Sequence, residues 1–235
     1  MPGEDEWDER LGDVLDAIYA AYGTGWDDVA GTDPAKSGLA VEALALAAML
    51  TRLLPLAAEA WGLVALLAFC QSRAAARRDA RGDYVPLHAQ DASRWDRELI
   101  AVAESALAKA ASLAAPGPYQ LEAAIQSAHA QRVWGGSTDW EAIALLYEGL
   151  VGLAPTIGAL VGRAAAVAET RDAASGWALL EEIPSDAVTS YQPYWALAAH
   201  LLRRMQRPEA ADAYTRAIGL CDDPAMREFL QKKAA

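Results

Sequence analysis

The chain has 235 residues, which is enough for one large or two small domains with a buried core. Its net charge is −12, whereas a protein that binds nucleic acid directly needs clustered Lys and Arg to neutralise phosphates. We therefore expect no direct DNA binding. Alanine and leucine are abundant and Phe is scarce, with 2 residues, so the composition favours helices over sheets.

Cysteine content and hydropathy indicate the cellular compartment in which we expect the protein. Cys70 and Cys221 both lie in apolar helical sequence, and two cysteines are too few for a disulfide framework in a chain of this size. The acidic start at residues 4–9 is unlike a signal peptide. The longest apolar stretch, residues 60–70, is too short to span a bilayer. We expect a soluble cytoplasmic protein with free thiols and no membrane contact.

Helical periodicity runs through most of the chain. The first predicted helix covers residues 7–22, and residues 23–38 are predicted as a polar loop. Capping-box spacing at Ser93 and Asp96, and again at Thr138 and Glu141, marks two later helix starts. The remaining helices are predicted from residue 38 to about 54, and at about 55–78, 93–114, 118–132, 139–154, 156–170, 173–183, 187–205, 208–220 and 224–233.

The predicted helices form three parts. Residues 1–80 are an irregular N-terminal helical part, 81–97 a linker with a turn at 81–83, and 98–235 an array of antiparallel helical hairpins. The array follows the tetratricopeptide (TPR) pattern, in which small residues let paired helices approach closely. We predict an all-α, right-handed, TPR-like array from the pattern at Tyr194, Leu197, Ala198, Leu201, Ala210, Tyr214 and Ala217, with an earlier echo at Ile143, Tyr147, Leu150 and Pro155.

A search for catalytic chemistry finds no motif that requires an enzyme. The three histidines, His88, His129 and His200, lack metal-ligand spacing. The sequence contains no phosphate-binding glycine loop of the P-loop or Rossmann type and no Gly-x-Ser-x-Gly elbow. We predict no cofactor and no metal.

The segment Gln90–Asp96 is a candidate binding site. It combines an amide, two carboxylates, a guanidinium and an indole at a helix start, where backbone N–H groups attract anions or carbonyls. The structural alternative is that Ser93 and Asp96 cap the helix, Trp95 packs under the linker, and Asp91 pairs with Arg73 or Arg77. Of the eight tryptophans, Trp61, Trp177 and Trp195 are expected in the core, and Trp26 and Trp134 at a groove or interface.

Several motifs carry a family resemblance. Gln90-Asp91-x-Ser-Arg-Trp-Asp96, residues 116–121 (Pro-Gly-Pro-Tyr-Gln-Leu), residues 138–140 (Thr-Asp-Trp) and residues 163–169 together resemble the C-terminal TPR-like extension of bacterial extracytoplasmic-function (ECF) sigma factors. No sigma-like DNA- or polymerase-binding sequence precedes residue 7. Cys70, Ala92 and Gly162 stand where that family has His, Arg and Asn.

The resemblance implies a regulatory module that modulates transcription initiation through protein–protein contacts with sigma-factor domains or RNA polymerase. The alternative is a stand-alone relative that binds a small molecule or acts as an enzyme, with a pocket around Gln90–Asp96. The candidate partner- or ligand-binding residues are Arg73, Arg77, Gln90, Asp91, Arg94, Trp95, Asp96, Tyr119, Gln120, Asp139, Trp140 and Arg163.

Overall fold

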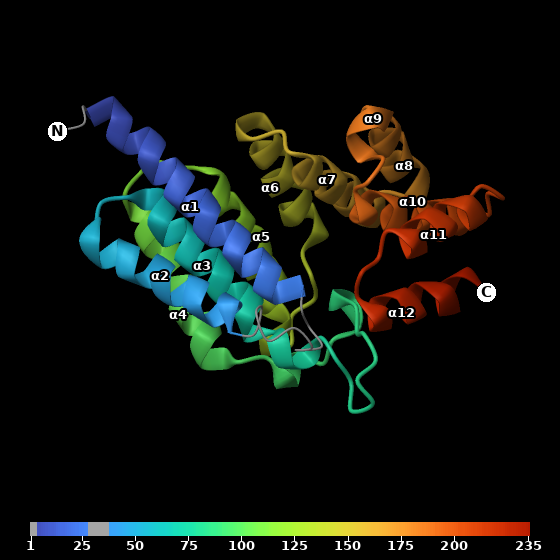
Figure 1. Cartoon of the computed structure of the whole chain (residues 1–235), viewed down its shortest axis with the longest axis horizontal. Coiled ribbons are helices and arrows are strands. Elements are labelled where there is room, and N and C mark those ends of the chain that lie inside the picture. Colours follow the sequence, from blue (N-terminus) through green and yellow to red (C-terminus); the bar gives the residue numbers. More distant parts are fainter. Residues whose placement is uncertain (1–3, 28–37) are drawn as a thin grey trace. The chain divides into compact units, whose positions relative to one another are not determined.

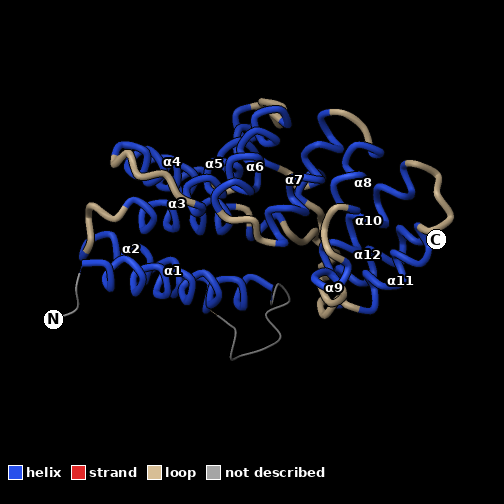
Figure 2. Tube along the Cα trace, turned by 90° about the horizontal axis from the view of Figure 1, so that it is seen from above, coloured by secondary structure: helices blue, strands red, loops and turns tan. Residues whose placement is uncertain are grey.

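The computed structural model describes residues 4–27 and 38–235, and in these ranges the regular secondary structure is helical (Figure 2). The predicted all-α class is therefore confirmed. The chain forms two compact units, which are residues 1–77 with 90–135 (unit 1) and residues 78–89 with 136–235 (unit 2). This division differs from the predicted boundaries after residues 80 and 97. No described helix is both long enough and apolar enough to cross a bilayer.

Unit 1 is built around one buried helix, α3 (Ala58–Ser72), whose Ala- and Leu-rich sequence is buried on nearly every side. The helices α1, α2, α4 and α5 all pack against it. Their bounds are α1 (Glu4–Asp27), α2 (Leu39–Leu53), α4 (Arg97–Ser112) and α5 (Pro118–Ala130), with 3-10 turns at Ala74–Ala76, Ala92–Arg94 and Gln131–Trp134 (Figure 1).

Three helices of unit 1 run in the same direction. Glu59, at the start of α3, bonds to Tyr119 at the start of α5, and Arg73, just after α3, bonds to Gln126 near the end of α5. α1 matches this direction, because its Asp16 accepts a hydrogen bond from the Tyr119 hydroxyl and its Trp26 contacts Arg77. Since α1, α3 and α5 are parallel, side chains at matching positions of these helices meet.

Unit 2 begins with the segment 78–89, which includes a 3-10 turn at Leu87–Ala89. Its core includes five residues of the predicted repeat pattern, Tyr194, Ala198, Leu201, Tyr214 and Ala217, whereas Leu197 and Ala210 of that pattern are only partly buried. Its helices are α6 (Trp140–Leu153), α7 (Ile157–Thr170), α8 (Ala173–Glu181), α9 (Ser185–Val188), α10 (Gln192–Arg204), α11 (Ala210–Gly219) and α12 (Pro224–Ala234).

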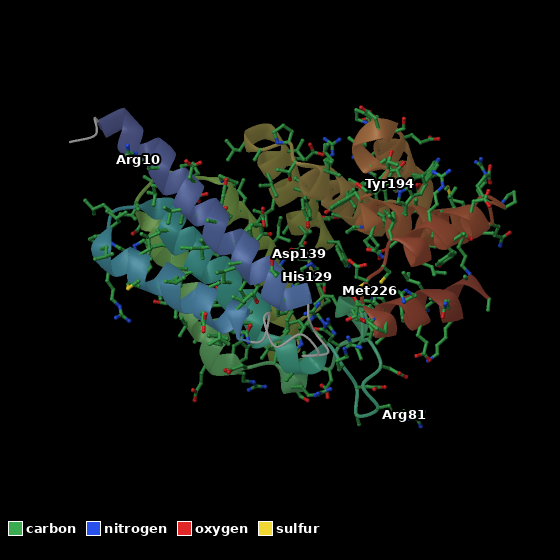
Figure 3. The ribbon with its side chains drawn as sticks, in the orientation of Figure 1. Arg10, Arg81, His129, Asp139, Tyr194 and Met226 are labelled. Carbon is green, nitrogen blue, oxygen red and sulfur yellow. The ribbon has the colours of Figure 1, made fainter. Side chains whose placement is uncertain are left out.

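The segment 78–89 packs on α12. Arg78 and Asp223 form an ion pair of 2.5 Å, and the rings of Tyr84 and Phe229 lie 5.5 Å apart. The predicted turn is present, since Asp79 Oδ1 accepts hydrogen bonds from two backbone N–H groups of the turn and Gly82 has a φ of 86°. Figure 3 shows Arg81 at the tip of this loop.

Several predicted helix ends shift. α1 continues to Asp27, so Trp26 lies on a helix and not in a loop, while residues 28–37 of the predicted loop lie outside the described residues. α3 begins at Ala58, after a turn that contains Pro55, and ends at Ser72. Asp96 caps α4, as predicted for it, but Ser93 does not, and Asp139 caps α6 in place of the predicted Thr138.

The single helix predicted at 187–205 is wrong, because the chain breaks between α9 and α10. Pro193 has no N–H group and its ring would clash with the carbonyl of Thr189 in a continuous helix. The break is held by the Trp195 indole, which donates to the Val188 carbonyl at 3.0 Å. The predicted core tryptophans Trp61, Trp177 and Trp195 are only partly buried.

Candidate functional site

A band of polar and aromatic side chains joins α1, α3 and α5, and we call it the polar seam. The residues of α1 and of α5 recur every three or four positions, which places them on one face of each helix. The seam comprises Asp16, Tyr19, Tyr22 and Trp26 from α1, Cys70, Arg73 and Arg77 from α3 and the turn after it, and Tyr119, Glu122, Gln126 and His129 from α5.

The amino-terminal end of the seam is acidic. The Tyr119 hydroxyl donates to Asp16 Oδ1 at 2.5 Å, and the Tyr19 hydroxyl donates to Glu122 Oε2 at 3.1 Å. The two tyrosine rings meet edge to face, with centroids 5.5 Å apart. Burial raises the pKa of Glu122 above its usual value, and the bond from Tyr19 opposes this shift. Both tyrosine hydroxyls are thus occupied by carboxyl partners.

Gln120 has a structural role beside this end. Its side-chain amide donates to Glu59 Oε1 at 3.0 Å and to the Ala115 carbonyl at 2.7 Å. Glu59 Oε2 accepts from the Tyr119 backbone N–H at 2.9 Å. Glu59 therefore caps α5 from a neighbouring helix, and these bonds leave Gln120 little capacity for a ligand.

The carboxyl-terminal end of the seam is basic and centres on the Trp26 ring. The Arg77 guanidinium lies 3.9 Å from the ring centroid and that of Arg73 lies 5.3 Å away, within cation–π range. The Tyr22 ring stacks on Trp26 with centroids 5.7 Å apart. Arg73 Nη2 donates to Gln126 Oε1 at 3.0 Å and contacts Cys70 Sγ at 3.7 Å.

Two titratable groups at this end are shifted toward their neutral forms. Burial, followed by the charges of Arg73 and Arg132, lowers the pKa of His129 to about 4, so its imidazole is neutral at pH 7. Figure 3 labels His129 near the end of α5. Desolvation raises the pKa of the Cys70 thiol despite the nearby Arg73. Cys70 is therefore a thiol rather than a reactive thiolate at neutral pH.

The carboxylates of the predicted segment Gln90–Asp96 cap helical turns. Asp91 Oδ1 accepts from the Ser93 N–H and Asp96 Oδ1 from the Leu99 N–H, both at 2.9 Å. The backbone N–H of Asp96 donates to the Ser72 carbonyl at 2.8 Å, which ties the segment to the end of α3. Asp91 thus binds its own turn, where pairing with Arg73 or Arg77 was predicted.

The other residues of this segment also make contacts within unit 1. Trp95 is buried, as predicted, and the Arg132 guanidinium lies 5.3 Å from its ring centroid. Arg132 also donates to the Gln90 carbonyl at 2.7 Å, and Arg94 donates to the Ala75 carbonyl. The segment is held largely by hydrogen bonds to backbone groups of unit 1.

The predicted residues do not converge on one site. Tyr119 lies beside Glu59 and the segment Gln90–Asp96 lies beside Ser72, at opposite ends of α3, about 20 Å apart at 1.5 Å per residue. Asp139, Trp140 and Arg163 belong to unit 2. There Asp139 caps α6, and Arg163 lies between Glu148 at 3.5 Å and Glu182 at 3.8 Å. Among the described residues, no His, Cys, Asp and Glu group resembles a metal site.

α2 presents a second candidate surface that the sequence interpretation missed. Only Ala43, Ala47 and Thr51 of this helix are buried. Leu46, Met49 and Leu53 follow an i, i+3, i+7 spacing and are 46%, 49% and 69% exposed. We call these three residues the α2 stripe. The sequence could have indicated this surface. Residues 39–53 have few polar side chains, so not all of the apolar ones can lie on a single buried face.

Comparisons with known proteins find a family of unknown function and an uncharacterized relative. Residues 10–111, from α1 to α4, match a family of unknown function (DUF6596). An uncharacterized protein of Rhizobium meliloti (strain 1021) is 36% identical over 224 residues, covering 95% of this chain and 53% of the relative. The chain thus spans about half the length of that curated relative. No solved structure matches the chain.

Proposed function

We propose that this chain is a protein-interaction module that regulates a sigma-factor-type transcription protein through direct contact. The observation that supports the proposal is the α2 stripe, because a row of exposed large apolar side chains on a soluble protein is typical of a binding face. The resemblance of the sequence motifs to the ECF sigma-factor extension supplies the partner class.

The spacing of the stripe favours a helical partner. Leu46, Met49 and Leu53 form a single line along α2, and such a line fits between the side chains of a second amphipathic helix. Sigma-factor domains that bind DNA and polymerase are helical, so they offer suitable helices. The helical hairpins of unit 2 are consistent with a TPR-like scaffold, as the repeat pattern around Tyr194 and Tyr214 indicates.

Charge favours the same partner. The chain carries a net charge of −12, whereas a DNA-binding domain must be basic to neutralise phosphates. Opposite net charges steer two proteins together and raise their association rate. The proposed occupant of the α2 stripe is therefore an amphipathic helix on a basic sigma-factor domain, present in the same polypeptide or in a separate one.

The alternative function, a small-molecule site around Gln90–Asp96, has weaker support. Asp91 and Asp96 accept hydrogen bonds from backbone N–H groups, and Arg94 donates to a backbone carbonyl. These contacts account for the polar side chains without a ligand.

Binding of the full chain to purified ECF sigma factor, measured by calorimetry, tests the proposal. The double variant Leu46→Glu/Leu53→Glu should weaken binding more than tenfold, because it places carboxylates on the stripe. Val102→Glu, on the 52% exposed Val102 of α4, is the matched control and should leave binding unchanged. The absence of wild-type binding, or an equal loss in both variants, would contradict the proposal.

A further inference from the structure

We propose that Tyr22 and Arg73, at the basic end of the polar seam, form a binding site for the carboxylate group of a small organic acid. The inference rests on unit 1 alone and does not depend on the α2 stripe or on a protein partner.

The Tyr22 hydroxyl is a buried polar group with no hydrogen-bond partner among the described residues. Tyr22 is only 3% exposed, and a buried hydroxyl without a partner is costly and uncommon in folded proteins. The other two tyrosines of the seam, Tyr19 and Tyr119, donate to carboxylates. Tyr22 is thus the seam tyrosine whose hydroxyl can still donate to a ligand.

The charges of Arg73 and Arg77 act on the Tyr22 hydroxyl. Its pKa is raised, first by burial and then by Cys70, while the charges of Arg73 and Arg77 act in the opposite direction. The Trp26 ring, which stacks on Tyr22, also contacts both guanidinium groups. Tyr22, Arg73 and Arg77 are therefore gathered around one indole ring.

Arg73 has donors available. Both of its hydrogen bonds, to Gln126 and to Cys70, use Nη2 and go to neutral groups. Within the described ranges no hydrogen bond uses its Nε or Nη1, and no carboxylate lies within the 4.0 Å ion-pair distance. Arg73 is only partly buried.

These donors fit a carboxylate better than a phosphate. A guanidinium presents two parallel N–H groups that match the two oxygens of a carboxylate, and a tyrosine hydroxyl can donate a third bond. Glu122 lies one turn before Gln126 on α5, and its carboxyl disfavours a doubly charged phosphate nearby. The Trp26 ring offers apolar surface to the rest of the acid.

A purely structural role explains only part of this arrangement. Arg73 directly follows α3 as its C-cap, and a cation there interacts favourably with the helix dipole. That interaction gives no partner to the Tyr22 hydroxyl. In unit 2, Arg216 lies 4.4 Å from the Trp195 ring centroid, a similar Arg–Trp pair that provides a matched control.

Calorimetric titration of the full chain at low ionic strength tests the proposal, with benzoate as the probe, benzamide as its neutral analogue and inorganic phosphate as the competing anion. We expect saturable binding of benzoate and weaker binding of the other two. Tyr22→Phe removes one hydrogen bond to a charged group, so it should weaken benzoate binding about tenfold or more. Arg73→Met should abolish binding, and Arg216→Met should leave it unchanged.

A second readout separates binding from folding. A bound carboxylate offsets the charge of Arg73, which together with Arg132 lowers the pKa of His129, so benzoate should raise that pKa above about 4. The His129 signals in proton NMR spectra, assigned with His129→Gln, report this shift. The absence of saturable benzoate binding, equal binding of benzamide, tighter binding of phosphate, or unchanged binding in a folded Tyr22→Phe variant would each overturn the proposal.

Discussion

Glu59 on α3 and Gln120 on α5 are joined twice, because Glu59 Oε1 accepts hydrogen bonds from the backbone N–H of Gln120 at 3.3 Å and from its side-chain amide at 3.0 Å. The second oxygen accepts from the Tyr119 backbone N–H at 2.9 Å. The first N–H groups of a helix have no partner within the helix, and a negative charge there is favourable. One carboxylate therefore caps α5 and fixes it to α3.

Glu59→Ala should destabilise the protein by about 2–4 kcal/mol, since it leaves the backbone N–H groups of Tyr119 and Gln120 without their acceptor in a partly buried place. Glu98→Ala, on the exposed first turn of α4, should cost less than about 0.5 kcal/mol. Urea denaturation of both variants measures the difference. Equal losses would show that the Glu59 bonds contribute little.

Gly117→Ala should displace the Glu59 side chain and so disturb its cap on α5. The backbone of Gly117, with φ −150° and ψ 176°, suits alanine, but the added Cβ would lie 2.2 Å from Glu59 Cδ. We expect a loss of about 1–3 kcal/mol from overpacking. In a double-mutant cycle with Glu59→Ala the penalty should shrink, because the obstructing side chain is absent. An additive double variant would contradict this explanation.

The parts of the structure that follow from local sequence could be predicted, and the seam could not. The Asp79 turn, the helix that begins after Asp223 and the buried Tyr194 all depend on residues close in the sequence or on helical period. The pairs of the seam do not, since Tyr19 and Glu122 are 103 residues apart. Only the parallel packing of α1 and α5 on α3 brings them together.

The segment Gln90–Asp96 shows the opposite difficulty. Its polar residues predict a binding site and a structural junction equally well, because both uses need carboxylates and guanidinium groups near a helix start. The backbone carbonyls of Ser72 and Ala75 accept hydrogen bonds from this segment, which favours the structural junction. The position of these carbonyls depends on where α3 ends. The sequence interpretation extended α3 to residue 78 and so concealed these acceptors.

Asp223→Ala should destabilise unit 2 by about 2–4 kcal/mol. Asp223 Oδ1 accepts from the N–H groups of Ala225 and Met226 at 2.8 Å, and Oδ2 pairs with Arg78 at 2.5 Å. The variant removes a helix cap and leaves a partly buried guanidinium without its ion partner. Asp222→Ala, at the exposed neighbouring position, is the control. Thermal unfolding monitored by circular dichroism should show a clear drop for Asp223→Ala alone.

Gly162→Ala should be destabilising although alanine is the better helix former. A Cβ at this position of α7 would lie 2.4 Å from the Tyr147 ring on α6, so the two helices would have to separate. We expect a cost of about 1–3 kcal/mol. Gly152→Ala, where a Cβ meets nothing within 4 Å, should instead stabilise by about 0.5–1 kcal/mol. Chemical denaturation of both variants tests this contrast, and changes of the same sign would refute it.

His129 should make the protein less stable in mild acid. Its pKa is about 4 in the folded state and 6.5 in the unfolded chain, so between these values the unfolded state binds more protons. The free energy of unfolding should therefore fall as the pH drops from about 6.5 to about 4, by at most about 3 kcal/mol from this group.

His129→Gln removes the titrating imidazole, so the stability difference between wild type and variant should shrink steadily over that pH range. The raised pKa of Glu122 acts in the opposite direction, but it is present in both proteins and cancels in the difference. Urea denaturation at several pH values gives the curves, and a constant difference for His129→Gln would show that this histidine is not held neutral by its surroundings.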